Sequence, residues 1–127
     1  MARRVVSVPG LSHGDLPLPL AAEKDGLLIS GGIGALDPAT GTRPEALDDQ
    51  VAQLWVNVVA LLDAAGFSPD DVVKMTFYVT DASTRSLINP GWVALFPDAQ
   101  SRPARHTLVQ QLSAGQRIQA ELIAIAR

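Results

Sequence analysis

Hydrophobic residues recur every three or four positions from Pro44 to Ala65, a pattern that predicts an amphipathic helix. Pro44 and Glu45 suit the first turn of that helix, and Gly66, with Pro69 beyond it, suits its end. We therefore expect one long helix with a single buried face. The apolar positions that form this face are Leu47, Val51, Leu54, Val58, Leu61, Leu62 and Ala65.

A period of two replaces the helical period from Asp71 to Thr80, which predicts a strand with one buried face. The apolar side of this strand is expected to comprise Val73, Met75, Phe77 and Val79, and the other side Lys74, Thr76, Tyr78 and Thr80. Further strands are expected at Arg3–Val8, Ala22–Gly32, Arg105–Val109 and Ile118–Ala126, because these segments are rich in apolar and β-branched residues.

A second, weaker helical pattern covers Ala82–Phe96 and is interrupted by Asn89-Pro90-Gly91. The last two strands are expected to be joined by a turn at Ser113-Ala114-Gly115. The order is then strands, long helix, strand, short helix and two strands. This order predicts an α+β domain with two helices on one face of a mainly antiparallel sheet. The length suits a single domain over residues 1–127.

Composition excludes several kinds of chemistry. The chain has no cysteine, so disulfides, thiolate metal sites and cysteine nucleophiles are impossible. Its two histidines, His13 and His106, have no metal-ligand spacing, and we expect no metal site. The net charge of −3 with no basic run argues against nucleic acid as a partner.

The distribution of apolar residues also bears on location and assembly. No apolar run approaches the roughly 20 residues of a membrane span, and the N-terminus lacks the apolar core of a signal peptide. We therefore expect a cytoplasmic protein without a membrane partner. Charged residues make up only 18% of the chain, against about 25% for an average soluble domain. Part of the apolar surface is therefore expected to meet another subunit.

The glycine-rich string Ser30-Gly31-Gly32-Ile33-Gly34 invites comparison with a phosphate-binding loop. Asp37-Pro38 opens a turn where such a loop would lead into a helix, and no Gly-Lys-Ser/Thr follows. We interpret the string as the end of a strand, where glycine lets a ligand approach the backbone closely.

Two charged residues on apolar strands are the candidates for function. Arg105 begins a strand that Pro103 leads into stiffly, and its guanidinium keeps its charge, so burial would require an anionic partner. Glu121 is the lone carboxylate in the last strand. From the residues alone, a structural ion pair explains Arg105 as well as a function does, and an edge-strand charge explains Glu121 equally well.

These residues belong to a set of motifs in which the chain resembles the RidA (YjgF) family of enamine/imine deaminases over nearly its whole length. Their order and spacing together make the resemblance specific. The most specific motifs are Arg102-Pro103-Ala104-Arg105 and the ending Ala120–Ala126. The other matching segments are Gly26–Gly31, Asp37–Gly41, Leu61–Gly66, Val73–Asp81 and Phe96-Pro97.

The resemblance implies a chorismate-mutase-like α+β fold that forms a homotrimer, with sites in the clefts between subunits. It implies hydrolysis of 2-aminoacrylate-type enamines, through their imine tautomers, to 2-keto acids and ammonia without a cofactor. Arg105 matches the arginine that holds the substrate carboxylate, and Glu121 matches the residue that positions the attacking water. The pocket lining implied in the same way is Ser30, Gly31, Asn89, Trp92 and Thr107.

Three positions depart from the family pattern. Counting back from Gly26, Pro19 stands where the family has a tyrosine and Ala21 where it has a glutamine; Gly32 replaces a further glutamine. These shorter residues predict a wider pocket. Two alternatives therefore stay open beside the deaminase. The chain could be a non-catalytic trimer that binds a small carboxylate metabolite, or a pathway-specific relative that acts on another imine.

Overall fold

The computed structural model describes residues 2–113 and 115–127, which form one sheet covered by helices. Ala114, in the turn expected at residues 113–115, lies outside the described residues. The strands are β1 (Arg4–Val6), β2 (Ala21–Lys24), β3 (Leu27–Ser30), β4 (Val72–Val79), β5 (Ala104–Val109) and β6 (Ile118–Ile125). The helices are α1 (Leu47–Ala65) and α2 (Arg85–Leu95), with short 3₁₀ turns at Pro69–Asp71 and Ala82–Thr84.

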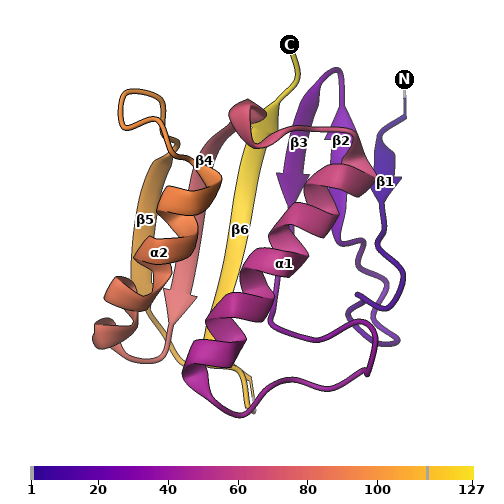
Figure 1. Cartoon of the computed structure of the whole chain (residues 1–127). Coiled ribbons are helices and arrows are strands. Elements are labelled where there is room, and N and C mark those ends of the chain that lie inside the picture. Colours follow the sequence, from indigo (N-terminus) through magenta and orange to yellow (C-terminus); the bar gives the residue numbers. More distant parts are fainter. Residues whose placement is uncertain (1, 114) are drawn as a thin grey trace.

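The sheet has the strand order β1-β2-β3-β6-β4-β5. Neighbouring strands run antiparallel except β4 and β5, which are parallel and joined through α2. Both helices lie on the same face of the sheet, and the opposite face is left open (Figure 1). The predicted α+β architecture, with two helices on one face of a mainly antiparallel sheet, is therefore confirmed.

The core lies between the helices and the sheet. The predicted apolar face of α1 is buried apart from its first residue, Leu47, which is partly exposed. Residues 44–46 do not join α1, because Ala46 is extended and the buried side chain of Gln50 donates a hydrogen bond to the carbonyl of Pro44 (2.8 Å). Gly66 ends α1 in the left-handed conformation, as predicted.

The strand expected within Ala22–Gly32, built on Leu27, Leu28 and Ile29, is present as β3, and the residues before it form the second arm of a hairpin, β2. Asp25 and Gly26 both adopt positive φ angles, 53° and 85°, and turn the chain between β2 and β3. An Asp-Gly pair of this kind matches the twist of two antiparallel strands, so the local sequence contained the signal. The side chain of Glu23 accepts a hydrogen bond from the Gly26 N–H (3.0 Å) and secures the turn.

The expected alternation in β4 holds except at its start. A bulge shifts the register between Val72 and Lys74, so Val72 is buried and Val73 is exposed. Beyond the bulge, Met75, Phe77 and Val79 face the core as predicted. The bulge depends on pairing with β6 and therefore leaves no local mark in the sequence.

The predicted break at Asn89-Pro90-Gly91 is wrong, because α2 continues through Pro90. Ile88 and Trp92 are buried on either side of Pro90, and their packing holds the helix against the sheet. Gly91 is needed where it stands: a Cβ at this position would lie 2.3 Å from the indole of Trp55. Tertiary packing thus overrides the local preference of proline.

The open face of the sheet carries a patch of exposed apolar side chains on the paired strands β3 and β6. The members of the patch are Leu27, Ile29, Ile123 and Ile125. In the part of the chain that the structure describes, no helix is both long and apolar enough to cross a membrane.

Candidate functional site

Arg105 lies at the start of the edge strand β5 and points to the same side of the sheet as the core, because it pairs with the buried Met75 of β4. Its guanidinium carbon is 5.4 Å from the ring centroid of Phe77 and 5.2 Å from that of Trp92. Its Nη1 donates to Asn89 Oδ1 (2.8 Å) and its Nη2 to the carbonyl of Arg85 (3.1 Å). Two residues of α2 therefore aim the guanidinium.

The charge of Arg105 is not neutralised by the groups around it. Within residues 2–113 and 115–127, neither ion pair involves Arg105, so the structural ion pair considered from the sequence is not found. Partial burial lowers the pKa of Arg105 from its ordinary value. A guanidinium has five N–H donors and stays protonated in proteins. The two neutral acceptors use two of these donors, and the others remain available to an anion.

Four of the predicted site residues meet at this point. Asn89 contacts the guanidinium directly, and Trp92 lies beneath it. Thr107 follows two residues after Arg105 on the same face of β5 and pairs with Phe77. The structure thus brings Arg105, Asn89, Trp92 and Thr107 together. Phe77 belongs to the same group and was expected only as a core residue.

Glu121 lies on β6 between β3 and β4, so the alternative of an edge-strand charge is wrong. It pairs with Thr76 on the open face, and its Oε1 accepts a 2.7 Å hydrogen bond from the hydroxyl of Tyr78. This bond raises the pKa of Tyr78 above its ordinary value, with burial adding to the effect. Tyr78 was placed on the polar side of its strand from the alternation alone, but its link to Glu121 was missed.

Ser30 and Gly31 lie at the end of β3, beside Glu121. The buried Ser30 hydroxyl accepts a hydrogen bond from the Leu122 N–H (2.8 Å), and the Gly31 N–H donates to the carbonyl of Leu20 (2.9 Å). Ser30 and Glu121 line one small hollow of about 140 Å³ on the open face, which Lys74 and Thr76 border from β4. The structure therefore brings Ser30 and Glu121 together at one hollow, and Gly31 follows Ser30 directly, just beyond β3.

The two groups are separated within one chain. Arg105 pairs with Met75, whereas Glu121 pairs with Thr76, the next residue of β4. Successive residues of a strand point to opposite faces, so Arg105 faces the helices and Glu121 faces away from them. Strand β4 also lies between them. The candidate residues therefore form two groups on opposite faces of the sheet, the Arg105 half-site and the Glu121 half-site.

A larger hollow of about 250 Å³ adjoins the end of β3 and was not predicted. Its lining includes His13, Gly32, Arg43, Gln116 and Gln119. Beside Gly32 itself there is no free space, because a Cβ there would lie 2.6 Å from Gln119 Nε2. A polar side chain thus occupies the space beside the glycine.

Neither of the other two departures from the family pattern lines this hollow, although Leu20 between them does. Ala21 is buried in the sheet opposite Ser30, and Pro19 is exposed before β2.

Within the described residues, no group of three or more histidine, aspartate or glutamate side chains lies close enough together to hold a metal ion.

Comparison with known proteins agrees with the fold and its motifs. Residues 19–127 match the family model described as Endoribonuclease L-PSP. A RutC family protein of Aquifex aeolicus is 36% identical over 111 residues, covering 86% of this chain and 88% of the relative. A 2-iminobutanoate/2-iminopropanoate deaminase of Salmonella typhimurium is 33% identical over 103 residues, covering 80% of each chain.

Solved structures give the same result. A conserved Rid family protein, YyfA of Yersinia pestis, superposes with a TM-score of 0.89 and 27% identity, covering 98% of this chain and 100% of that chain. Escherichia coli TdcF with bound serine superposes with a TM-score of 0.85 and 25% identity, covering 98% of this chain and 99% of that chain. The fold is therefore that of the small α+β proteins of the Rid type. The chain belongs to the RidA (YjgF) family.

Proposed function

We propose that this protein hydrolyses small 2-imino acids and their enamine tautomers, of the 2-aminoacrylate type, to 2-keto acids and ammonia without a cofactor. The proposal rests on the surroundings of the Arg105 guanidinium. Its guanidinium lies over two aromatic rings, is aimed by neutral acceptors and has no carboxylate partner among the described residues. Such a group suits the carboxylate of a small acid.

The relatives support the same substrate class. The Salmonella typhimurium relative is named a 2-iminobutanoate/2-iminopropanoate deaminase, and an Escherichia coli relative is named a reactive intermediate deaminase. The TdcF structure contains serine, a small molecule with a carboxylate. A bidentate contact of a carboxylate with Arg105 would contribute about 1.5–3 kcal/mol, enough to orient so small a substrate.

The separated half-sites support a site shared between subunits. We propose a homotrimer in which Arg105 of one copy faces Ser30, Gly31 and Glu121 of the next. The apolar patch of the open face, Leu27, Ile29, Ile123 and Ile125, provides surface whose burial would stabilise such an assembly. The Glu121 half-site lies on this same face.

In the proposed reaction, Arg105 holds the carboxylate while Glu121 orients one water molecule towards C2 of the imine. The hydroxyl of Tyr78 holds Glu121 from one side through its hydrogen bond. The water oxygen forms a bond to C2, one water proton is lost and the nitrogen gains a proton. The hydroxyl of the resulting carbinolamine then loses its proton and the nitrogen gains one, so that the carbon–nitrogen bond breaks, ammonia leaves and the oxygen becomes the carbonyl of the 2-keto acid. Because an imine carbon is already electrophilic, positioning and proton transfer suffice.

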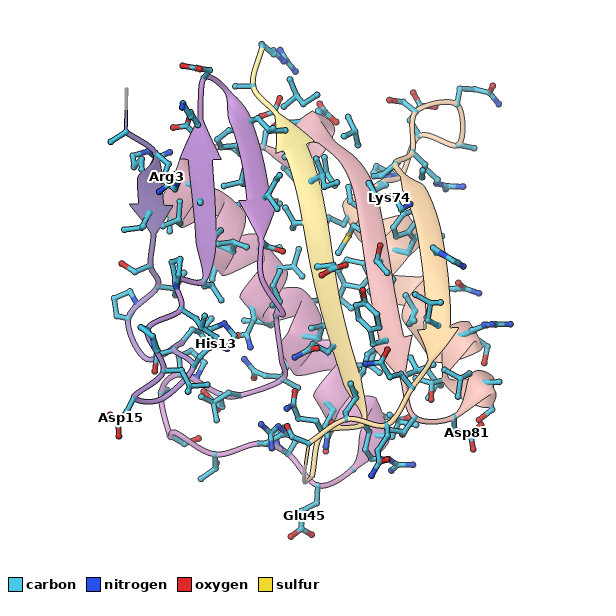
Figure 2. All side chains as sticks on the ribbon, turned by 180° about the vertical axis from the view of Figure 1, so that it is seen from behind. Arg3, His13, Asp15, Glu45, Lys74 and Asp81 are labelled. Atoms are coloured by element: carbon cyan, nitrogen blue, oxygen red, sulfur yellow. The ribbon has the colours of Figure 1, made fainter. Side chains whose placement is uncertain are left out.

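The decisive experiment measures 2-keto acid release from 2-aminoacrylate generated in situ. We expect the wild-type protein to exceed the protein-free rate and Arg105→Ala to fall to that rate. Arg3→Ala is the matched control, because Arg3 is an exposed arginine next to β1, at the opposite edge of the sheet from β5 (Figure 2). Near-normal turnover of an acidic imine by Arg105→Ala would contradict the proposal.

One observation favours a second function, a trimer that binds a carboxylate metabolite without catalysis. Pro19 stands in the position that the resemblance assigns to a tyrosine. Tyr78 is the single tyrosine of the chain, so the segment around Pro19 has no other phenol that could take over the role of the family tyrosine. A wild-type protein that binds a 2-keto acid through Arg105 but accelerates no imine hydrolysis would support this alternative. Acceleration with a different imine would instead support a pathway-specific relative.

A further inference from the structure

The loop between β1 and β2 places His13 over the glycine-rich end of β3. A Cβ added to Gly31 would lie 3.9 Å from His13 Nε2, an ordinary contact distance, so the imidazole lies close to the residue that follows β3. Figure 2 shows His13 in this loop, on the side of the molecule where β3 ends. The imidazole therefore reaches the backbone that the second half-site uses.

Local bonds hold the loop in this position. The buried Leu11 anchors it, and the Leu11 N–H donates to the carbonyl of Val8 (2.9 Å). The hydroxyl of Ser12 accepts a hydrogen bond from the Gly14 N–H (3.3 Å), and Gly14 supplies a positive φ of 69°. His13 is thus presented by a turn with a defined backbone.

The His13 cavity and the Glu121 hollow are neighbours on the same two strands. Gln119 lines the first and Glu121 lines the second, and these residues are two positions apart on one face of β6. Ser30, the last residue of β3, borders the Glu121 hollow, and Gly32, two residues further on, borders the His13 cavity. A substrate bound along Ser30–Gly32 would therefore have Glu121 on one side and His13 on the other.

Of the residue types that line this cavity, histidine is the one that most often serves as a general acid or base in enzymes. Glutamine side chains do not titrate, and the other ionisable group lining the cavity, Arg43, belongs to a residue type that keeps its charge. In the adjoining hollow Lys74 and Glu121 are ionisable, and Glu121 is bonded to Tyr78. An imidazole ordinarily changes its charge between about pH 5 and 8.

We propose that His13 is a catalytic residue of this chain that carries the proton in imine hydrolysis, an inference that rests on the proposed deaminase function. Neutral His13 accepts a proton from the attacking water as the oxygen–carbon bond to C2 forms. The imidazolium gives that proton to the nitrogen, which yields a neutral carbinolamine. His13 then takes the hydroxyl proton and passes it to the nitrogen, the carbon–nitrogen bond breaks, ammonia leaves and the oxygen becomes the carbonyl of the 2-keto acid. No proton is gained or lost by the enzyme over one turnover.

The test compares His13→Gln and His13→Ala with His106→Gln, which removes the other histidine of the chain, an exposed residue of β5. General acid–base catalysis typically contributes 10²- to 10⁴-fold, so we expect kcat to fall about 100-fold in both His13 variants. Binding of a simple 2-keto acid should change by less than about threefold, because Arg105 provides that contact. Added imidazole should restore part of the activity of His13→Ala, and His106→Gln should retain wild-type kcat.

The pH profile is the readout that a merely structural role would not move. Wild-type kcat should fall as pH decreases through the range in which an imidazole becomes protonated, and this limb should be absent in His13→Gln. If His13→Gln keeps wild-type kcat while Arg105→Ala is inactive, the role of His13 is overturned and the deaminase function stands. If the wild-type protein hydrolyses no imine while it binds a 2-keto acid, both are overturned together.

Discussion

The hydroxyl of Tyr78 donates a 2.7 Å hydrogen bond to Glu121 Oε1 across two neighbouring strands of the open sheet face. Tyr78 pairs directly with Gln119 and Glu121 with Thr76, so the bond is a diagonal contact between β4 and β6. It leaves the second carboxylate oxygen of Glu121 as an acceptor for water, and it holds the carboxylate in one orientation.

This contact predicts the titration of Tyr78. Because Tyr78 is the only tyrosine, the phenolate absorbance reports this residue alone. Its pKa should exceed the ordinary value of 10.0, first because the hydroxyl is bonded to Glu121. Glu121→Gln should lower that pKa, whereas Glu23→Gln, which removes a carboxylate of the hairpin turn, should leave it unchanged. A Tyr78 pKa insensitive to Glu121→Gln would contradict the hydrogen bond.

The raised pKa of Tyr78 also predicts how the bond between Tyr78 and Glu121 affects the stability of the protein at different pH values. A group whose pKa is raised on folding stabilises the protein at pH values below its unfolded pKa. This contribution is lost as pH rises through the folded-state pKa of Tyr78. Wild-type and Tyr78→Phe proteins should therefore differ in Tm at neutral pH, and the difference should shrink in alkaline buffer. A difference that grows above pH 10 would show that the sign is wrong.

Arg105→Lys tests whether recognition needs the shape of the guanidinium as well as its charge. A lysine loses the planar fork and its stacking on Phe77 and Trp92, so we expect 2-keto acid affinity to fall roughly tenfold or more. Calorimetry of wild type, Arg105→Lys and Arg105→Ala measures this effect. Equal 2-keto acid affinity of the wild-type and Arg105→Lys proteins would show that Arg105 contributes only its positive charge.

Glu121→Gln separates positioning of water from binding. If Glu121 orients the water, kcat should fall while affinity for a 2-keto acid stays nearly intact, because Arg105 makes the carboxylate contact. Steady-state kinetics with in situ generated imine and calorimetry with the keto acid provide the two numbers. Lost affinity with unchanged kcat would assign Glu121 to binding instead.

Assembly is tested on the open face. Ile125 is 53% exposed in the patch of the sheet, and Val56 is 58% exposed on α1, so the two make a matched pair. Ile125→Asp should place a charge in the proposed interface and shift the trimer towards monomers in light scattering. Val56→Asp should leave the trimer intact. A wild-type protein that remains monomeric at micromolar concentration would remove the shared-cleft arrangement.

Gly91→Ala should destabilise the fold. This is the opposite of the effect expected from helix propensity alone, because alanine stabilises a helix by about 1 kcal/mol relative to glycine. The added Cβ would lie 2.3 Å from the indole of Trp55, and overpacking of this kind typically costs about 1–3 kcal/mol. Ser86→Ala, at an exposed position of the same helix, is the control. An increased Tm for Gly91→Ala would show that Trp55 moves aside freely.

Periodicity along the chain was sufficient to predict the long helix, the core side of β4 beyond its bulge and the one-sided sheet. These features follow from contacts between each residue and one buried face, which repeat along an element with period 3.6 or 2. The lone charges on two apolar strands likewise singled out Arg105 and Glu121, and the family motifs then supplied their expected roles.

Other features depended on strand pairing and packing between distant residues. The bulge at Val73 follows from the register with β6, and the helix through Pro90 follows from the burial of Ile88 and Trp92. The placement of Arg105 and Glu121 on opposite faces required the register of both β5 and β6 against β4. A shift of one residue in either register would reverse the face, so only the paired sheet could separate the two half-sites.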